Sequence, residues 1–284
     1  MPSSQHPIEY SVPATTWDEG LPLGNAMLGA LVWGDGNPLN ISLDRADLWD
    51  LRPVPEFHAP EYSYATMRRW HEAGRHDDLI RVFEDPYRRP APTKIPAGRI
   101  EISSPHSFRA STLDIANALA SVEFEGGAKC EIFQHATQPL GVLWLRGSGA
   151  KFHLRAPDFG GEIVNAAAGG IDCGDLSQLG YPPPQESSGE NFQASEQSGW
   201  DGFQFAVYLA WREDANGIFA AWSIVSSFEG AGVLDIARRR VEAALQNGFD
   251  NLLDTHCAWW RDFWEKSSLA LPDKQLEKQW FLET

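Results

Sequence analysis

The sequence predicts a mainly β fold, a large antiparallel two-sheet β-sandwich followed by linker helices. Repeated hairpin signals run to about residue 232 without amphipathic helices between them, which favours antiparallel sheets. From Leu234 onward the apolar residues recur with the period of a helix. With 284 residues, 43% of them hydrophobic, the chain has enough apolar content for a substantial core.

The first element is a glycine-rich segment, TWDEGLPLGNAMLGALVWGDG, at residues 16–36. Its glycines permit positive φ angles or close backbone approach around a short apolar strand at residues 28–33. The spacing does not match a phosphate-binding loop, because the dinucleotide motif needs a glycine where Ala26 stands and the P-loop needs a lysine where Ala30 stands. The segment therefore predicts a turn, a strand and a second turn.

The next stretch, PLNISLDRADLWDLRP, alternates apolar Leu39, Ile41 and Leu43 with polar neighbours, which predicts a half-buried strand. Residues 64–83 then follow a polar helical pattern, and DPYRRPAPTKIPAG interrupts it with four prolines. We expect this part to be an insertion peripheral to the sheets.

Hairpin signals dominate the middle of the chain. Gly126-Gly127 separates two alternating runs, and GVLWLRG supplies a further strand. Asn216-Gly217 separates two long runs, QFAVYLAWRED and the following IFAAWSIVS. Residues 156–200 are rich in glycine, proline and serine, so we expect long loops there.

Three helices are predicted at the end of the chain. The first ends at Asn247-Gly248, and the second begins with Asp250 as its N-cap. The second carries an aromatic stripe that needs a partner surface, formed by Leu253, Cys257, Trp260 and Trp264.

The third helix has Asp273 near its start and Leu276 and Trp280 on one face. A helix with an apolar face and no following partner is physically incomplete. We therefore expect the sequence to be the front part of a longer protein.

The amino-acid composition narrows the classes of partner that this chain can bind. A net charge of -16 and a pI near 4.8 argue against nucleic acid, because binding to phosphates rests on Lys and Arg. No stretch of about twenty apolar residues occurs, so we expect no membrane span. The twelve tryptophans either fill the core or form stacking platforms for sugar rings or bases.

Metal and cofactor sites are not indicated. Cys130, Cys173 and Cys257 lie far apart, so they form no metal or redox motif and are expected to be free thiols. The sequence HEAGRH places its second histidine one residue too far along for the zinc motif. The N-terminus has no basic or apolar leader, so we expect the chain as written to be cytoplasmic or to be missing its leader.

Acidic residues offer candidates for glycoside hydrolysis, which needs two carboxylates about 5 to 10 Å apart. They lie in two groups, Asp18 with Glu19, and Asp44, Asp47 and Asp50. Solvated acids and turn caps are the simpler interpretation of both groups. The separated histidines His135, His153 and His256 favour structural roles, and the absence of Gly-x-Ser-x-Gly leaves a serine hydrolase without support.

Several segments together resemble glycoside hydrolase family 95, the α-L-fucosidase type. TWDEGLPLGNAMLGALVWGDG followed by LNISLDRADLW resembles the N-terminal signature of that family, and IPAGRIEI and STLDIANALASVEFEGGAKCEIFQHATQPLGVLWL resemble its following strands in the same order. The similarity is best over about residues 10–146. Ala26 replaces the usual glycine, and only Asp47, Leu48 and Trp49 remain of the Asn-Glu-Asp-x-Leu-Trp motif.

The resemblance implies a domain plan and a glycan substrate. It implies a β-sandwich at residues 1–232, a helical linker at 233–271 and the start of an (α/α)6 barrel at 272–284, with inverting hydrolysis of α-L-fucosides or related glycans. The family's catalytic carboxylate lies in the barrel, so we assign no catalytic residue, metal or cofactor to this chain. For the sandwich side of the sugar site, the candidates are Asn25, Trp33, Asp47 and Trp49.

The alternative is a non-catalytic carbohydrate-binding or scaffold module, whose tryptophans stack on glycans. The burial of Trp260 and Trp264 distinguishes the independent module from the fragment of a longer glycosidase. If they pack inside this chain, an independent module is favoured, whereas exposed rings would indicate a missing barrel.

Overall fold

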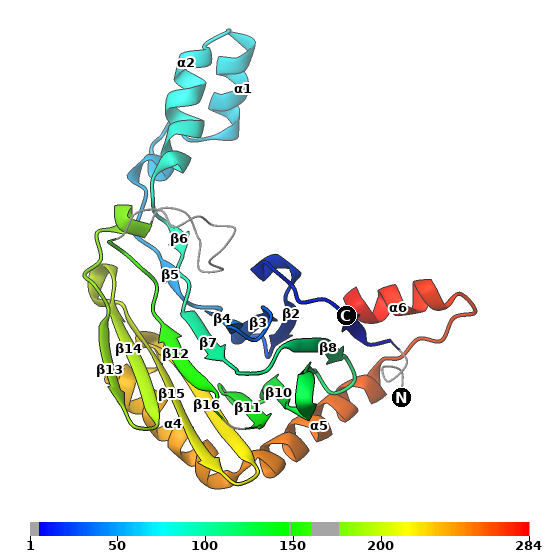
Figure 1. The fold of residues 1–284 in the computed structure, drawn as a ribbon. Coiled ribbons are helices and arrows are strands. Elements are labelled where there is room, and N and C mark those ends of the chain that lie inside the picture. The colour runs from blue at the N-terminus through cyan, green and yellow to red at the C-terminus, as the bar shows by residue number, and fades with distance from the viewer. Residues whose placement is uncertain (1–5, 148, 161–175, 284) are drawn as a thin grey trace.

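The computed structural model describes residues 6–147, 149–160 and 176–283. Two antiparallel sheets pack against one another, and they confirm the predicted sandwich (Figure 1). The larger sheet has nine strands in the order β1 (Ile8–Tyr10), β8 (Phe108–Asp114), β9 (Leu119–Phe124), β10 (Lys129–Gln134), β11 (Gly141–Arg146), β16 (Gly217–Ser226), β15 (Gln204–Asp214), β14 (Phe192–Ser198) and β13 (Gln185–Gly189).

The smaller sheet has five strands in the order β12 (Lys151–Arg155), β7 (Gly98–Ser103), β4 (Leu39–Arg45), β3 (Leu28–Trp33) and β2 (Leu21–Gly24). A separate two-stranded ribbon joins β5 (Trp49–Asp50) to β6 (Thr93–Lys94). Short 3-10 turns occupy Trp17–Glu19, Pro55–His58, Glu125–Gly127, Leu176–Leu179, Trp200–Gly202 and Ser227–Glu229.

The main core lies between the two sheets. Strand β3 sends Leu28, Ala30 and Val32 into it, as its alternation predicts. At its centre, fully buried Trp222 pairs across the strands with Gly141. A Cβ at Gly141 would lie 1.9 Å from Cε2 of Trp222, so the indole occupies the space that a side chain would take.

A second core lies on the outer face of the larger sheet, where α4 (Val233–Asn247) packs on β15 and β16 (Figure 1). Its members include Val233, Ala237 and Val241 from the helix and Ala206 and Ala221 from the sheet. The larger sheet is thus buried on both faces at this point, which explains why all of β16 is buried.

The predicted hairpins are confirmed: β9 pairs with β10 around Gly126-Gly127, and β15 pairs with β16 beside Asn216-Gly217. Residues 156–200, predicted as long loops, instead contain the hairpin of β13 and β14. Every β13 side chain is exposed, so this edge strand lacks the apolar alternation that would identify it. Part of the predicted loop, residues 161–175, lies outside the described residues, and so does Cys173.

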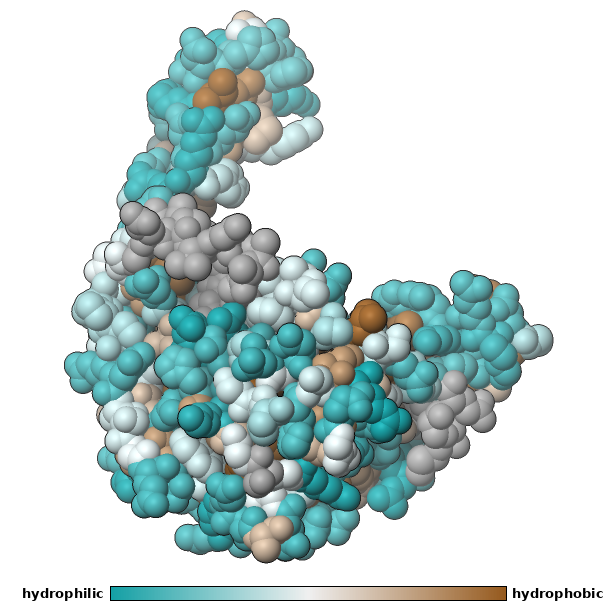
Figure 2. All heavy atoms as spheres, in the orientation of Figure 1, coloured by the Kyte–Doolittle hydropathy of each residue, from teal (hydrophilic) through white to brown (hydrophobic). Residues whose placement is uncertain are grey.

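The peripheral insertion is also confirmed. It consists of α1 (Tyr64–Glu72), α2 (His76–Leu79), a π-helical turn (Ile80–Glu84) and a 3-10 turn (Asp85–Arg88), and it projects away from the sheets (Figure 1). Ser63 caps α1, because its Oγ accepts from the Thr66 N–H at 3.2 Å. The insertion exposes large apolar side chains such as Met67 and Ile80, and Figure 2 shows a hydrophobic area on it.

The predicted N-cap of the second terminal helix, Asp250, is wrong by two residues. Helix α5 (Phe249–Lys266) begins directly after Gly248, which ends α4 at φ 88° and serves as the N-cap of α5. Asp250 therefore lies in the first turn, where its negative carboxylate interacts favourably with the positive, N-terminal end of the helix dipole. Trp264 is 4% exposed, so this part of the predicted stripe is buried.

Helix α6 (Lys274–Glu283) begins as predicted, with Asp273 Oδ1 accepting from the N–H groups of Gln275 and Leu276 at 3.0 and 3.2 Å. The structure buries a different face of this helix from the one that carries Leu276. Leu276 is 59% exposed, and Glu277 and Phe281 are buried instead.

The reason is a contact with the N-terminal segment. Glu277 Oε1 accepts from His6 Nε2 at 2.9 Å, and Phe281 stacks on the His6 ring and packs against Trp264. This contact selects the face of α6 that is buried. Among the described residues, no helix is long and apolar enough to cross a membrane.

Candidate functional site

Trp33 lies at the end of β3 on the outer face of the smaller sheet. The side chain is 6% exposed but belongs to neither hydrophobic core. Its Nε1 donates to Ser42 Oγ at 3.0 Å, and the Arg99 guanidinium lies over its ring, with Cζ 5.5 Å from the centroid. Trp33 lines a pocket of about 460 Å³. The other lining residues are Pro13, Ala14, Thr15, Gly34, Asp35, Pro38, Asn40, Arg99, Glu101 and Arg155.

The side-chain amide of Asn25 links two loops through hydrogen bonds. Its Nδ2 donates to the carbonyl oxygens of His135 and Gln138 at 2.8 and 3.0 Å. Its Oδ1 accepts from the N–H groups of Met27 and Leu28 at 3.2 and 2.7 Å. All four hydrogen-bonding positions of the amide are therefore used. Asn25 borders a second, smaller pocket of about 290 Å³.

Asp47 is held by a buried arginine. Arg45, 2% exposed, donates through Nε and Nη2 to Asp47 Oδ1 and Oδ2 at 2.6 and 2.9 Å. Burial alone would raise the pKa of Asp47, but the hydrogen bonds from Arg45 and Ser226 outweigh it, and the pKa lies below its ordinary value. Asp47 is thus a stable anion, suited to accepting hydrogen bonds and unsuited to donating a proton.

Trp49 is 42% exposed and lies on the β5–β6 ribbon. Its Nε1 donates to the Ala46 carbonyl oxygen at 3.0 Å, which leaves part of the ring open to solvent.

The four candidates do not converge on one pocket. Asn25 precedes β3 and Trp33 ends it, so the six residues of this strand separate them by roughly 16 Å. Trp33 lines one pocket and Asn25 another. A role of any of the four in glycan binding stays a prediction.

A general acid of the kind that glycosidases use needs a raised pKa. In the described part of the chain, every carboxyl with a shifted pKa has it lowered, namely Asp47, Asp50, Asp78, Glu101, Glu229 and Glu277. Each accepts hydrogen bonds from cationic side chains, mostly arginines, which stabilise the charged form. These carboxylates therefore hold cationic side chains in place through charged hydrogen bonds.

His135 and His256 join α5 to the larger sheet. His256 is fully buried, its Nε2 donates to the Asn117 carbonyl oxygen at 2.6 Å, and its Nδ1 accepts from the Ala136 N–H at 3.1 Å. His135 Nε2 donates to Thr255 Oγ1 at 3.0 Å. Burial lowers the pKa of both imidazoles, to about 4 for His256. Both are therefore neutral structural links, and within the described ranges no three His, Cys, Asp or Glu side chains gather to hold a metal ion.

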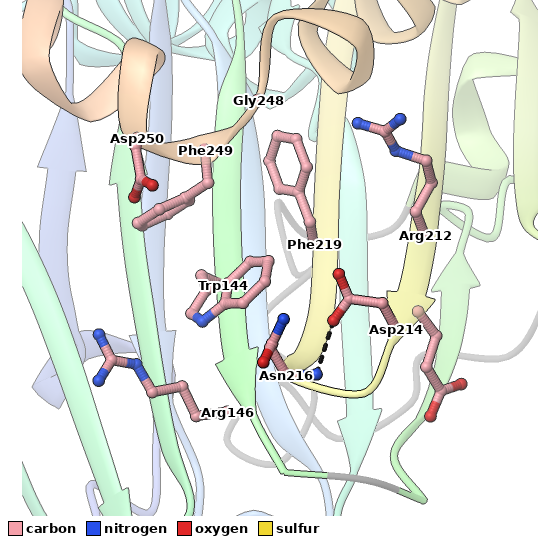
Figure 3. Close-up of a pocket in the computed structure, with 10 residues that line it drawn as sticks. Trp144, Arg146, Arg212, Asp214, Asn216, Phe219, Gly248, Phe249 and Asp250 are labelled. Carbon is pink, nitrogen blue, oxygen red and sulfur yellow. Dashed lines mark hydrogen bonds between the residues drawn. The ribbon is translucent and has the colours of Figure 1, made fainter.

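A larger pocket of about 820 Å³ lies on the outer face of the larger sheet, where α4 meets α5 (Figure 3). Its aromatic side chains are Trp144, Phe219 and Phe249, with ring centroids 5.8 to 6.4 Å apart. Its polar rim consists of Arg146, Arg212, Glu213, Asp214, Asn216 and Asp250. Aromatic rings beside planar polar groups can contact both the C–H face and the hydroxyls of a sugar.

The sequence reasoning missed this pocket and the polar lining around Trp33. GVLWLRG predicts a strand, and its alternation also places Trp144 and Arg146 together on one face. In the same way, GRIEIS alternates Arg99 and Glu101 with buried isoleucines. In both strands, the polar side chains that alternate with the buried apolar ones are the sequence signal that indicates these pockets.

Comparison with known families supports a glycoside hydrolase relationship. The family model described as "Glycosyl hydrolase family 65, N-terminal domain" matches residues 8–155. A comparison with curated proteins finds no match.

Proposed function

Because this chain belongs to the family of glycosyl hydrolase family 65 N-terminal domains, we propose that it is the non-catalytic β-sandwich of a glycoside hydrolase acting on glycans. The family match carries this proposal. The matched residues include all of the smaller sheet and strands β1 and β8 to β11 of the larger one. The match therefore extends through both layers of the sandwich.

For the substrate, we propose α-L-fucosides or related glycans, hydrolysed with inversion. The support is the resemblance of residues 16–36 and of the following strands to glycoside hydrolase family 95. The finer assignment rests on that resemblance alone, and a substrate panel tests it separately from the glycosidase proposal.

The catalytic acid is proposed to lie outside the described residues, in a helical barrel that packs on this domain. The lowered carboxyl pKa values support this, because a general acid must hold its proton near neutral pH. Helix α6 offers a place for contact, since Leu276 and Leu282 are 59% and 41% exposed. Burial of these side chains by a partner would be favourable.

The test compares two proteins, the chain of residues 1–284 and the product of the whole reading frame that contains it. Both are assayed on aryl α-L-fucosides and on a panel of other aryl glycosides. We expect no hydrolysis by residues 1–284 and hydrolysis by the whole product, with NMR detecting the inverted anomer first.

Hydrolysis by residues 1–284 alone would contradict the non-catalytic role. A whole product that cleaves another glycoside but no fucoside would contradict only the substrate assignment. A reading frame that ends with Thr284 and yields no activity would contradict the glycosidase proposal and favour the second candidate.

The second candidate is an independent glycan-binding module. Two observations favour it: the pocket with the Trp144 ring beside a polar rim, and the packing of Trp264 against Phe281 of the same chain. Replacement of Trp144 by alanine should then abolish retention on immobilised glycans. The Trp200→Ala variant, whose indole is 40% exposed and lies outside this pocket, is the matched control.

A further inference from the structure

The N-terminal segment lies between the sandwich and the last helix. Strand β1 pairs with β8 at the edge of the larger sheet, and its Ile8 and Tyr10 pack against the main core. Just before β1, His6 and Pro7 contact α6, which lies beside them in Figure 1. We call residues 6–10 the N-terminal strap, because the sheet holds one end of this segment and α6 contacts the other.

Three contacts join the N-terminal strap to α6. His6 is 6% exposed, and its Nε2 donates to Glu277 Oε1 at 2.9 Å. Lys278 Nζ donates to the Pro7 carbonyl oxygen at 3.2 Å. The His6 ring also stacks on Phe281, with the ring centroids 5.6 Å apart and an angle of 23° between the ring planes. Two hydrogen bonds and one aromatic contact thus connect the two ends of the described chain.

Glu277 is a buried acceptor whose charge is stabilised on all sides. Its Oε2 accepts from Lys274 Nζ at 2.8 Å and from the Leu271 N–H at 2.6 Å. The hydrogen bonds from Lys274, His6 and Leu271 lower the pKa of Glu277 to about 2. The carboxylate is therefore ionised near neutral pH and can only accept, so His6 is the donor. A hydrogen bond to an ionised group is stronger than one between neutral groups.

Helix α6 and strand β1 have little stability of their own. Helix α6 has ten residues, and isolated helices shorter than about 12 to 15 residues are marginal in water. Its buried side chains are Glu277 and Phe281, and both contact His6. Strand β1 has three residues and pairs with β8 alone. Each element therefore gains stability from the other, while Trp264 of α5 supplies a further ring contact to Phe281.

We propose that the N-terminal strap is a conformational device that couples the docking of α6 to the pairing of β1. When the strap leaves α6, the helix loses the contacts of both its buried side chains with His6. When α6 moves away, β1 loses the same contacts, because a coupling free energy acts equally in both directions. One consequence rests on the proposed function: the strap sets the direction in which the chain leaves the sandwich toward the proposed catalytic barrel.

The test is amide hydrogen exchange of the chain of residues 1–284, followed by mass spectrometry in α6, β1 and β16. His6→Ala should speed exchange in α6 about tenfold, the effect of one lost hydrogen bond to a charged group. Gln279→Ala is the matched control, because Gln279 also lies on α6 but its side chain donates to exposed Glu283. It should leave exchange in α6 nearly unchanged. Unchanged protection of β16 shows that the sandwich stays folded.

The reverse direction provides the second measurement. Glu277→Ala should speed exchange in β1, although Glu277 is far from β1 in the sequence. If this variant also loses protection in β16, Lys278→Ala takes its place, since it removes the hydrogen bond to Pro7. The inference is overturned if His6→Ala leaves α6 as protected as before or if Gln279→Ala has the same effect. It is also overturned if β1 does not respond to the change on α6.

The strap and the glycosidase proposal fail separately, because hydrogen exchange requires no catalytic activity. A whole protein that hydrolyses glycosides while β1 and α6 exchange independently would overturn only the strap. Coupled exchange of β1 and α6 in a protein without any hydrolytic activity would overturn only the glycosidase assignment.

Discussion

Mild acid should loosen the attachment of α5 through His256. Nδ1 of this fully buried imidazole accepts from the Ala136 N–H, so a protonated ring would have to break that bond and carry a charge without solvent. Burial accordingly lowers the pKa of His256 to about 4, with smaller contributions from its neighbours. In the unfolded chain the pKa returns to about 6.5.

Proton linkage gives the sign and the size of the change in the free energy of unfolding. Below about pH 6.5 the unfolded chain binds a proton at His256 that the folded chain does not, so the free energy of unfolding falls as the pH falls. From about pH 7.5 to about pH 5, this residue alone should remove about 2 kcal/mol. The loss continues until the pH reaches the folded pKa of about 4.

The assay is urea unfolding, followed by tryptophan fluorescence at a series of pH values within this window. His256→Gln should remove most of the pH dependence and leave a smaller part from His135, whose pKa burial also lowers. His76→Gln, at an exposed position on the insertion, should leave the dependence unchanged. The reasoning is refuted if the His256→Gln variant loses stability with acid as steeply as the unaltered chain.

Three further changes test the backbone and the core by the same unfolding measurement. Ala26 has φ 69°, so Ala26→Gly should stabilise the fold by about 0.5 to 1 kcal/mol, and a loss of stability would contradict left-handed strain there. Gly141→Ala should destabilise it by about 3 kcal/mol or prevent folding, because the new Cβ meets Trp222, and a neutral result would contradict this packing. Gln134 is buried with both side-chain polar atoms unpaired, so Gln134→Met should add about 1 kcal/mol, and a large loss would indicate a hidden partner.

Local signals made much of the fold predictable. The β15–β16 hairpin could be predicted because its turn residues and its alternation lie within one short stretch of sequence. Strand β4 was expected to be half-buried, but it is buried on both faces except at Asp44, since Trp33, Arg99 and the strands around them cover its polar side. That covering depends on strand register, which a single sequence does not determine.

The candidate site was less predictable for the same reason. Asn25 and Trp33 are close in the sequence and were assigned to one wall, yet a strand extends fully between them. Asn40 and Arg99 are 59 positions apart in the sequence, and they line one pocket only because β4 and β7 are neighbours. Side chains that share a pocket in this way leave no common pattern along the chain.

Gly248 is the single residue that separates α4 from α5, and it also lines the pocket of Figure 3. Its two backbone torsion angles therefore set the direction of α5 relative to the larger sheet. A molecule in that pocket would touch the joint from which the C-terminal helices extend. If the torsion angles of Gly248 change, the shape of that pocket changes with them, because Phe249 and Asp250 at the start of α5 also line it.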